Sequence, residues 1–185
     1  MLKEIQAKAE KEMRKAIEAT LKGFNGVRTG RASLTLLDGL MVEAYGSAVP
    51  VNQVATMAVP ETRLITVQPW DPSLLPAIER AIRKSDLGIT PTNDGKIVRI
   101  AIPPLTEERR KELVKVVRKM AEEGRVAVRN ARREANDALK REEREKEASE
   151  DDAKHGVDAI QELTNRLIHE IDGLLAKKEK EIMEF

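Results

Sequence analysis

The sequence predicts an α+β protein: a long three-helix bundle with an inserted small β/α/β domain, joined by two linkers that together form a hinge. Charged residues make up 35% of the 185 residues and aromatic residues only 2%. This balance is typical of long charged helices, and the rings are too few for a β-sandwich or for binding single-stranded RNA by stacking. Apolar residues recur at helical spacing at both ends of the chain, whereas β-branched residues alternate in the middle.

The first helix is expected over residues 2–24. Apolar side chains recur there every three or four positions, which places them on one face. They are Ile5, Ala9, Met13, Ala16, Ile17 and Phe24. Gly23, Gly26 and Gly30 then end the helix.

Residues 31–104 are expected to form short strands around one helix. The five apolar runs that predict strands are Leu40–Ala44, Val49–Val51, Val54–Val59, Leu64–Val67 and Ile97–Ile102. Turns are expected at Tyr45-Gly46-Ser47 and Asn93-Asp94-Gly95. The helix runs from about Ser73 to Lys84. Trp70 is the only tryptophan and is expected to be a buried anchor.

Two long helices are expected over about 106–148 and 150–183, separated by an N-cap cluster at Ser149-Glu150-Asp151-Asp152. A helix of the first length needs partners along its whole apolar stripe. That predicted stripe is Leu113, Val116, Val117, Met120, Gly124, Ala127, Ala131, Ala135 and Ala138. The last helix offers Val157, Ile160, Leu163, Leu167, Ile171, Leu174, Leu175 and Ile182. The first helix fills the groove between them, which gives the three-helix bundle.

The bundle is therefore discontinuous, with residues 1–30 and 105–185 in one domain and residues 31–104 inserted. The chain crosses between the domains at Thr29-Gly30-Arg31 and at Pro103-Pro104. Glycine supplies a pivot and the prolines a stiff extended segment, so the pair of linkers predicts a hinge. The alternative is two domains locked together by a contact surface.

The net charge of +1 conceals a strongly uneven distribution. Residues 109–133 hold ten basic and three acidic side chains, whereas residues 134–185 hold nine basic and sixteen acidic ones. On a helical wheel the basic residues are expected opposite the apolar stripe, with Glu122 the one acid among them. They are Lys111, Lys115, Arg118, Arg125, Arg129, Arg132 and Arg133. Such a row suits the phosphates of a folded RNA, although a charge run can also be only a solvated face.

Enzyme chemistry is poorly supported. The absence of cysteine excludes thiolate nucleophiles and cysteine-ligated metals. His155 and His169 lack metal-ligand spacing, and no phosphate-binding loop or nucleophile elbow occurs. No apolar run is long enough to span a membrane, and acidic residues in the first helix argue against a targeting peptide. We expect a cytoplasmic monomer without metal or cofactor.

Several motifs, in order along the whole chain, resemble those of the ribosome recycling factor family of bacteria. They are Val27-Arg28-Thr29-Gly30-Arg31-Ala32-Ser33, Gln68-Pro69-Trp70-Asp71, Ser85-Asp86-Leu87-Gly88, Pro104-Leu105-Thr106-Glu107-Glu108-Arg109-Arg110 and Arg125-Val126-Ala127-Val128-Arg129-Asn130-Ala131-Arg132-Arg133. Leu34, where the family often has proline, and Ala44, where it often has tyrosine, depart from the pattern.

The resemblance implies a non-enzymatic translation factor with an outline like transfer RNA. Its bundle would bind large-subunit ribosomal RNA after termination, and elongation factor G would meet the inserted domain and split the ribosome by GTP hydrolysis. The family's RNA-binding arginines map to Arg110, Arg129 and Arg132. Further candidates are Arg28, Arg31 and Arg133, with Arg125 from the basic row. Two alternatives stay open: a hibernation or stabilising factor that binds the same RNA, and a scaffold that binds helical protein partners.

Overall fold

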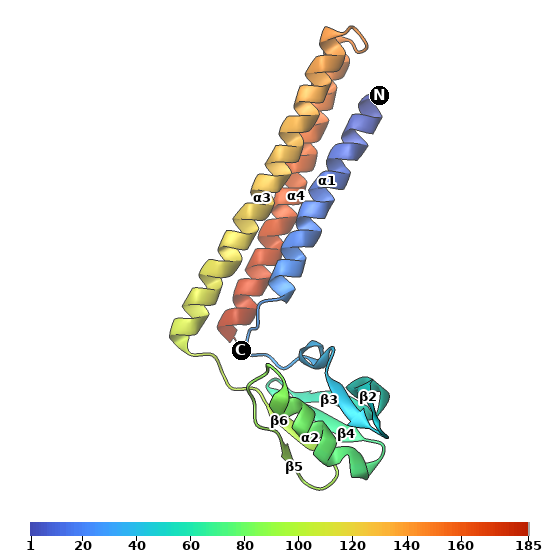
Figure 1. Ribbon diagram of the computed structural model, residues 1–185. Helices are drawn as coiled ribbons and strands as arrows, with labels where there is room; N and C mark the ends of the chain where they lie inside the picture. Colours follow the sequence, from blue (N-terminus) through green and yellow to red (C-terminus); the bar gives the residue numbers. More distant parts are fainter. Residues whose placement is uncertain (185) are drawn as a thin grey trace. The chain divides into compact units, whose positions relative to one another are not determined.

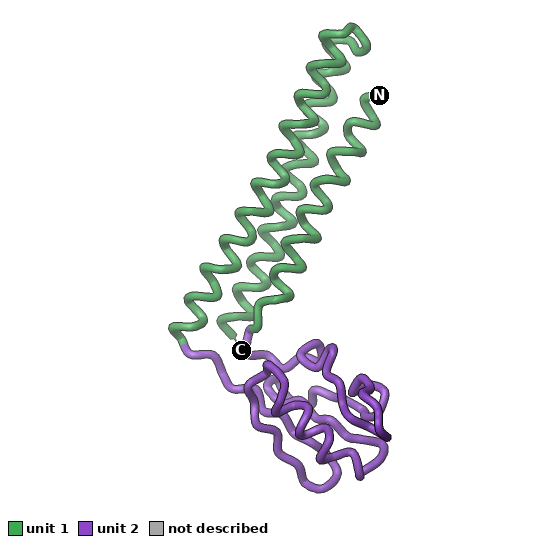
Figure 2. The backbone as a smooth tube through the Cα atoms, in the orientation of Figure 1, with its two compact units in different colours: residues 1–28, 107–184 green, residues 29–106, 185 purple. Residues whose placement is uncertain are grey.

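The computed structural model describes residues 1–184, which form two compact units (Figure 2). Unit 1 is Met1–Arg28 with Glu107–Glu184, and unit 2 is Thr29–Thr106. The boundaries lie two residues inside those expected for the bundle, so Thr29-Gly30 and Leu105-Thr106 belong to unit 2. Phe185 lies outside the described residues.

Unit 1 consists of three helices, α1 (Leu2–Asn25), α3 (Glu107–Arg144) and α4 (Glu150–Glu184), which lie side by side (Figure 1). On α1 the predicted face is confirmed for Ala9, Met13, Ile17 and Phe24, which are all buried. On α4 the residues that bury most fully include Ile160, Leu163, Leu167, Ile171 and Ile182, all from the predicted stripe.

The buried face of α3 is rotated from the predicted one. Val116 is 41% exposed and Ala127 is exposed, although both were expected in the stripe. The buried residues are Leu113, Val117, Ala121, Gly124, Val128, Ala131, Ala135 and Leu139. Most steps between them alternate between three and four residues, the pattern that keeps one seam against neighbouring helices. Many of the residues here are alanine or glycine, which occur on more than one face of α3. Their positions therefore do not define the centre of the buried stripe precisely.

The turn between α3 and α4 comes earlier than the expected residue 148. Lys146 adopts a left-handed conformation with φ of 58°. Its amide donates to the carbonyl of Glu143, and the amide of Glu147 donates to the carbonyl of Glu142. This is the Schellman arrangement, which satisfies the last carbonyls of a helix. The predicted N-cap of α4 is confirmed, since Ser149 Oγ accepts from the Asp152 amide at 3.1 Å.

Unit 2 packs a four-stranded antiparallel sheet with one helix (Figure 1). The sheet order is β3 (Ala55–Glu61), β4 (Leu64–Pro69), β6 (Val98–Ala101) and β5 (Thr92–Asn93), and α2 spans Leu75–Lys84. A hairpin of β1 (Met41–Ala44) and β2 (Ser47–Pro50) turns at Tyr45-Gly46, with φ of 53° and 82°. Single-turn 3₁₀ helices span Leu34–Leu37, Val51–Gln53 and Pro72–Leu74. The core of the unit includes Ile65, Val67, Ile78, Ile82 and Ile100.

The expectation that Trp70 is buried was wrong, because its side chain is 66% exposed. Along β4 the buried residues alternate as Ile65, Val67 and Pro69, so residue 70 falls on the opposite face. The indole N–H does not need the core, since Nε1 donates to Thr56 Oγ1 at 2.9 Å. An apolar face therefore remains available at the end of β4.

Candidate nucleic-acid interface

Three arginines of α3 recur every seven residues and reach across to α4; we call them the seam arginines. The pairs are Arg118 Nε–Glu179 Oε1 (2.6 Å), Arg125 Nη2–Asp172 Oδ1 (2.6 Å) and Arg132 Nη1–Gln161 Oε1 (3.2 Å). The expectation that they lie opposite the apolar stripe was wrong. They border it, because a seven-residue step keeps a side chain at the edge of a helix–helix contact.

A second set of basic residues faces away from α4: Lys115, Lys119, Arg129 and Arg133, which we call the outer cations. They follow one another at helical spacing, so they share a face of α3. Among residues 1–184, Lys115, Lys119 and Arg133 have no ion-pair partner, and all three are exposed. Arg129 is 37% exposed and pairs with Glu122. These cations are therefore free, or nearly free, to bind phosphate groups.

Glu122 lies on this outer face and contacts two arginines. Its Oε1 lies 3.1 Å from Arg129 Nη1, and its Oε2 lies 3.0 Å from Arg125 Nη1. The hydrogen bonds from Arg129 and then Arg125 lower the pKa of Glu122 below its ordinary value. The carboxylate is therefore ionised at neutral pH, and its negative charge offsets part of the positive charge around it.

The remaining predicted arginines are not among the outer cations. Arg110 is half-buried, and its Nη1 donates to the Met183 carbonyl at 2.9 Å, so it holds the last turn of α4. Arg28 is exposed at the end of unit 1, and Arg31 is exposed at the start of unit 2. Arg110 thus has a structural contact within the bundle, whichever other contact it makes.

The predicted hinge residues occupy the two crossings between the units. Gly30 has φ of 75°, a left-handed conformation that glycine adopts without strain. Thr29 is buried, whereas Pro103 and Pro104 are exposed. The two prolines lie in an irregular stretch between β6 and α3, and neither can donate a backbone hydrogen bond.

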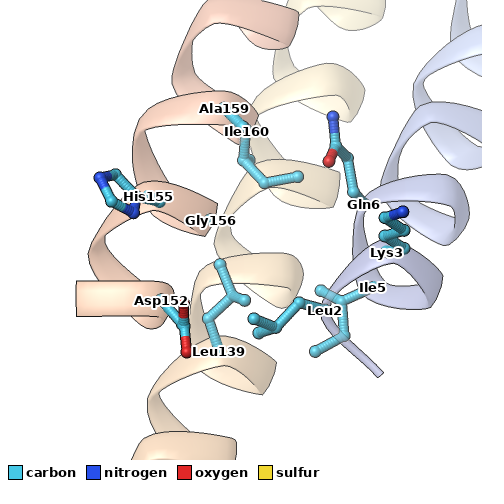
Figure 3. A pocket seen from close by; sticks show the side chains of 10 residues that line it. All are labelled: Leu2, Lys3, Ile5, Gln6, Leu139, Asp152, His155, Gly156, Ala159 and Ile160. Carbon is cyan, nitrogen blue, oxygen red and sulfur yellow. The ribbon is translucent and has the colours of Figure 1, made fainter. Parts of the chain in front are cut away.

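A cavity of about 290 Å³ lies between the ends of α1, α3 and α4, and its lining includes Leu2, Ile5, Leu139 and Ile160 (Figure 3). In Figure 3 the side chains of Leu2 and Leu139 point toward each other, and His155 is the only histidine in the lining. Within residues 1–184 no group of acidic or histidine side chains is arranged to hold a metal ion. Over the same residues no helix has the length and apolar character that a membrane span requires.

Comparison with known proteins decides the family. The family model described as "Ribosome recycling factor" matches residues 20–183. The chain belongs to the ribosome recycling factor family. It is 54% identical over 185 residues to the ribosome-recycling factor of Desulfatibacillum aliphaticivorans, covering all of both chains. It is 56% identical over 184 residues to that of Symbiobacterium thermophilum, again covering all of both chains.

Solved structures agree. The solution structure of a ribosome recycling factor has a TM-score of 0.74 and 46% identity, covering 100% of this chain and 98% of that one. The T. thermophilus ribosome recycling factor, in models with the E. coli elongation factor G bound to the E. coli post-termination complex, has a TM-score of 0.63 and 51% identity, covering 98% of both chains. The predicted family and α+β fold are therefore confirmed, and the chain is a ribosome recycling factor by family, a translation factor and not an enzyme.

Sequence reasoning missed the residues of α4 that hold the seam arginines. Asp172 and Glu179 are seven residues apart, as are Arg118 and Arg125. In an antiparallel helix pair, opposite charges at matching seven-residue steps predict contacts across the seam. That signal was present in the sequence and would have separated the seam arginines from the outer cations.

Proposed function

We propose that this chain binds the post-termination ribosome through large-subunit ribosomal RNA, with the outer face of α3 toward the RNA. The observation that carries this is the set of exposed outer cations at helical spacing on one face. Guanidinium and ammonium groups so placed can contact successive phosphates of a structured RNA without reading bases. Arg132 can join them after it releases Gln161. Arg125 is held by two carboxylates, so it contributes to the electrostatic potential of this face more than to direct phosphate contacts.

Elongation factor G is the protein partner with which this chain acts on the ribosome. With GTP hydrolysis by that factor, the ribosome separates into subunits and releases mRNA and tRNA. The relative solved together with elongation factor G on a post-termination complex supports this assignment. The chain itself needs no cofactor, because GTP belongs to the partner, and it acts in the cytoplasm, where ribosomes are recycled.

We further propose that unit 2 meets elongation factor G and that the two units move about the crossings at Thr29-Gly30-Arg31 and Pro103-Pro104. Unit 2 holds seven basic and seven acidic residues, so it has no net attraction for RNA. Its exposed rings are Trp70 and Tyr45, whose polar atoms are satisfied by Thr56 Oγ1 and by Asp71 Oδ2 at 2.7 Å. Fixed, exposed aromatic rings are characteristic anchors of protein contacts.

Sedimentation of post-termination ribosomes through a sucrose gradient tests the function. With this chain, elongation factor G and GTP, we expect free subunits; omission of any one component leaves intact ribosomes. Intact particles in the complete reaction, resistant to splitting, would instead indicate a stabilising or hibernation factor. Replacing GTP with a non-hydrolysable analogue is the matched control for the energy source.

A further inference from the structure

On the outer face of α3, an acid lies between the cations at positions 119 and 129. Glu122 lies three residues after Lys119 and seven residues before Arg129, so it shares their face. Its neighbour Glu123 points in a different direction, about 100° around the helix, and has no ion-pair partner among residues 1–184. The two acids therefore differ in position and contacts but not in chemistry.

Glu122 occupies part of the hydrogen-bonding edge of the Arg129 guanidinium. Arg129 Nη1 is directed to Glu122 Oε1 at 3.1 Å. The other oxygen of Glu122 accepts from Arg125, which is itself held by Asp172 and whose side chain is only 19% exposed. Glu122 is therefore held in place from the α4 side, and its charge remains beside Arg129 when a ligand approaches.

A phosphate that contacts Arg129 must then either replace this carboxylate or lie beside it. Replacement breaks an existing ion pair, and proximity sets two negative charges a few ångströms apart. Both effects weaken binding. An exposed charge pair of this kind typically changes an equilibrium by up to about fivefold.

We infer that Glu122 limits the affinity of the α3 outer face for RNA phosphate, so that the factor can leave the ribosome after each round. The inference rests on the proposed function, since it requires that this face bind ribosomal RNA. It assigns Glu122 a role opposite to that of its neighbours: it competes with phosphate for Arg129. Arg129 is thereby kept in place on the outer face, but only part of its guanidinium can bind phosphate.

The test compares Glu122→Gln with Glu123→Gln. Both remove one negative charge with almost no change in size, but only the first frees Arg129. We measure the dissociation constant for purified ribosomes over a salt titration, and splitting with ribosomes in excess over the factor. Glu122→Gln should bind about two- to fivefold more tightly at low salt. Its log–log salt slope should be steeper by about 0.9, which corresponds to one additional phosphate contact. With ribosomes in excess, Glu122→Gln should also split fewer ribosomes per factor per unit time, because it dissociates more slowly. Glu123→Gln should change the dissociation constant less than about twofold.

Equal effects of the two variants, or weaker binding by Glu122→Gln, would overturn the inference; weaker binding would show that Glu122 instead orients Arg129 for the RNA. Arg129→Ala, made in the native and the Glu122→Gln backgrounds, separates this failure from failure of the proposed function. If Arg129→Ala changes binding in neither background, the face does not contact RNA. If it weakens native binding while Glu122→Gln fails to tighten it, only the role of Glu122 is wrong. Circular dichroism of each variant verifies that the helices remain folded.

Discussion

Arg125 Nη2 lies 2.6 Å from Asp172 Oδ1, so an arginine from the middle of the basic row joins α3 to α4 instead of facing solvent. Its side chain is 19% exposed and also donates to Glu122. A guanidinium enclosed by two carboxylates stabilises the helix pair, provided that both partners stay in place. The basic row thus combines two functions, one that holds the bundle together and one that faces outward.

Arg125→Ala should therefore lower the stability of the bundle. We expect a loss of about 1–2 kcal/mol, because the substitution removes partly buried packing, leaves Asp172 without its arginine and leaves Glu122 with Arg129 alone. Arg118→Ala is the matched control: its pair with Glu179 is similar, but its side chain is 63% exposed, so the loss should be clearly smaller than that of Arg125→Ala. Urea unfolding followed by helical circular dichroism measures both. Equal losses would show that burial at Arg125 is unimportant.

Arg133→Ala should weaken ribosome binding without affecting the fold. Arg133 is exposed and has no partner among residues 1–184, so its loss removes a phosphate contact and nothing else. The log–log salt slope of binding should become shallower by about 0.9. Arg132→Ala should act in the same direction, with a small loss of stability from its bond to Gln161. Arg141→Ala, on a different face of α3, is the control, and a slope change as large as that of Arg133→Ala would contradict the proposed face.

Gly124→Ala should destabilise the bundle, because Thr20 Oγ1 of α1 occupies the space that a Cβ at position 124 would need. We expect a cost of about 1–3 kcal/mol. Gly173→Ala is the matched control on α4: nothing lies within 4 Å of its Cβ position, so it should stabilise the helix by up to about 1 kcal/mol. Adding Thr20→Ala to Gly124→Ala should recover most of the loss in thermal unfolding. A neutral Gly124→Ala would mean that α1 and α3 separate at low cost.

The architecture was predictable where spacing alone decides it, and less so where two neighbours compete. Phe24 and Ile171 follow helical steps of large apolar residues, and both were correctly placed in the core. Val116 and Val117 are chemically identical neighbours, and only packing against α1 and α4 decides that Val117 is the buried one. The two-residue strand Thr92–Asn93 was missed because it is too short to show an alternation.

The candidate site was predictable as a region but not residue by residue. The excess of basic residues on α3 marked the helix, yet a single-helix wheel contains no information about the helix beside it. Arg125 and Arg129 are four residues apart and look alike in the sequence. Asp172, more than forty residues away, makes one of them structural.

Shortening Pro103-Pro104 by one residue should uncouple binding from splitting. The outer face of α3 is unchanged, so the dissociation constant for ribosomes should stay within about twofold. If unit 2 moves about both crossings, as we propose, splitting with elongation factor G should be lost. Binding and gradient sedimentation on the same preparations measure the two effects. Splitting at the native rate would refute a working hinge, and replacement of both prolines by alanine tests whether length or stiffness matters.

Trp70→Ala should impair the step that uses elongation factor G while leaving ribosome binding intact. The indole is 66% exposed and makes one hydrogen bond, to Thr56, so its removal should cost unit 2 little stability. If its face anchors the partner, the concentration of elongation factor G for half-maximal splitting should rise about thirtyfold, the effect of losing a dominant interface residue. Trp70→Phe should recover much of the activity because it restores an aromatic face. Val59→Ala, an exposed apolar residue of β3, is the control, and an unchanged requirement for elongation factor G in Trp70→Ala would remove Trp70 from the proposed contact.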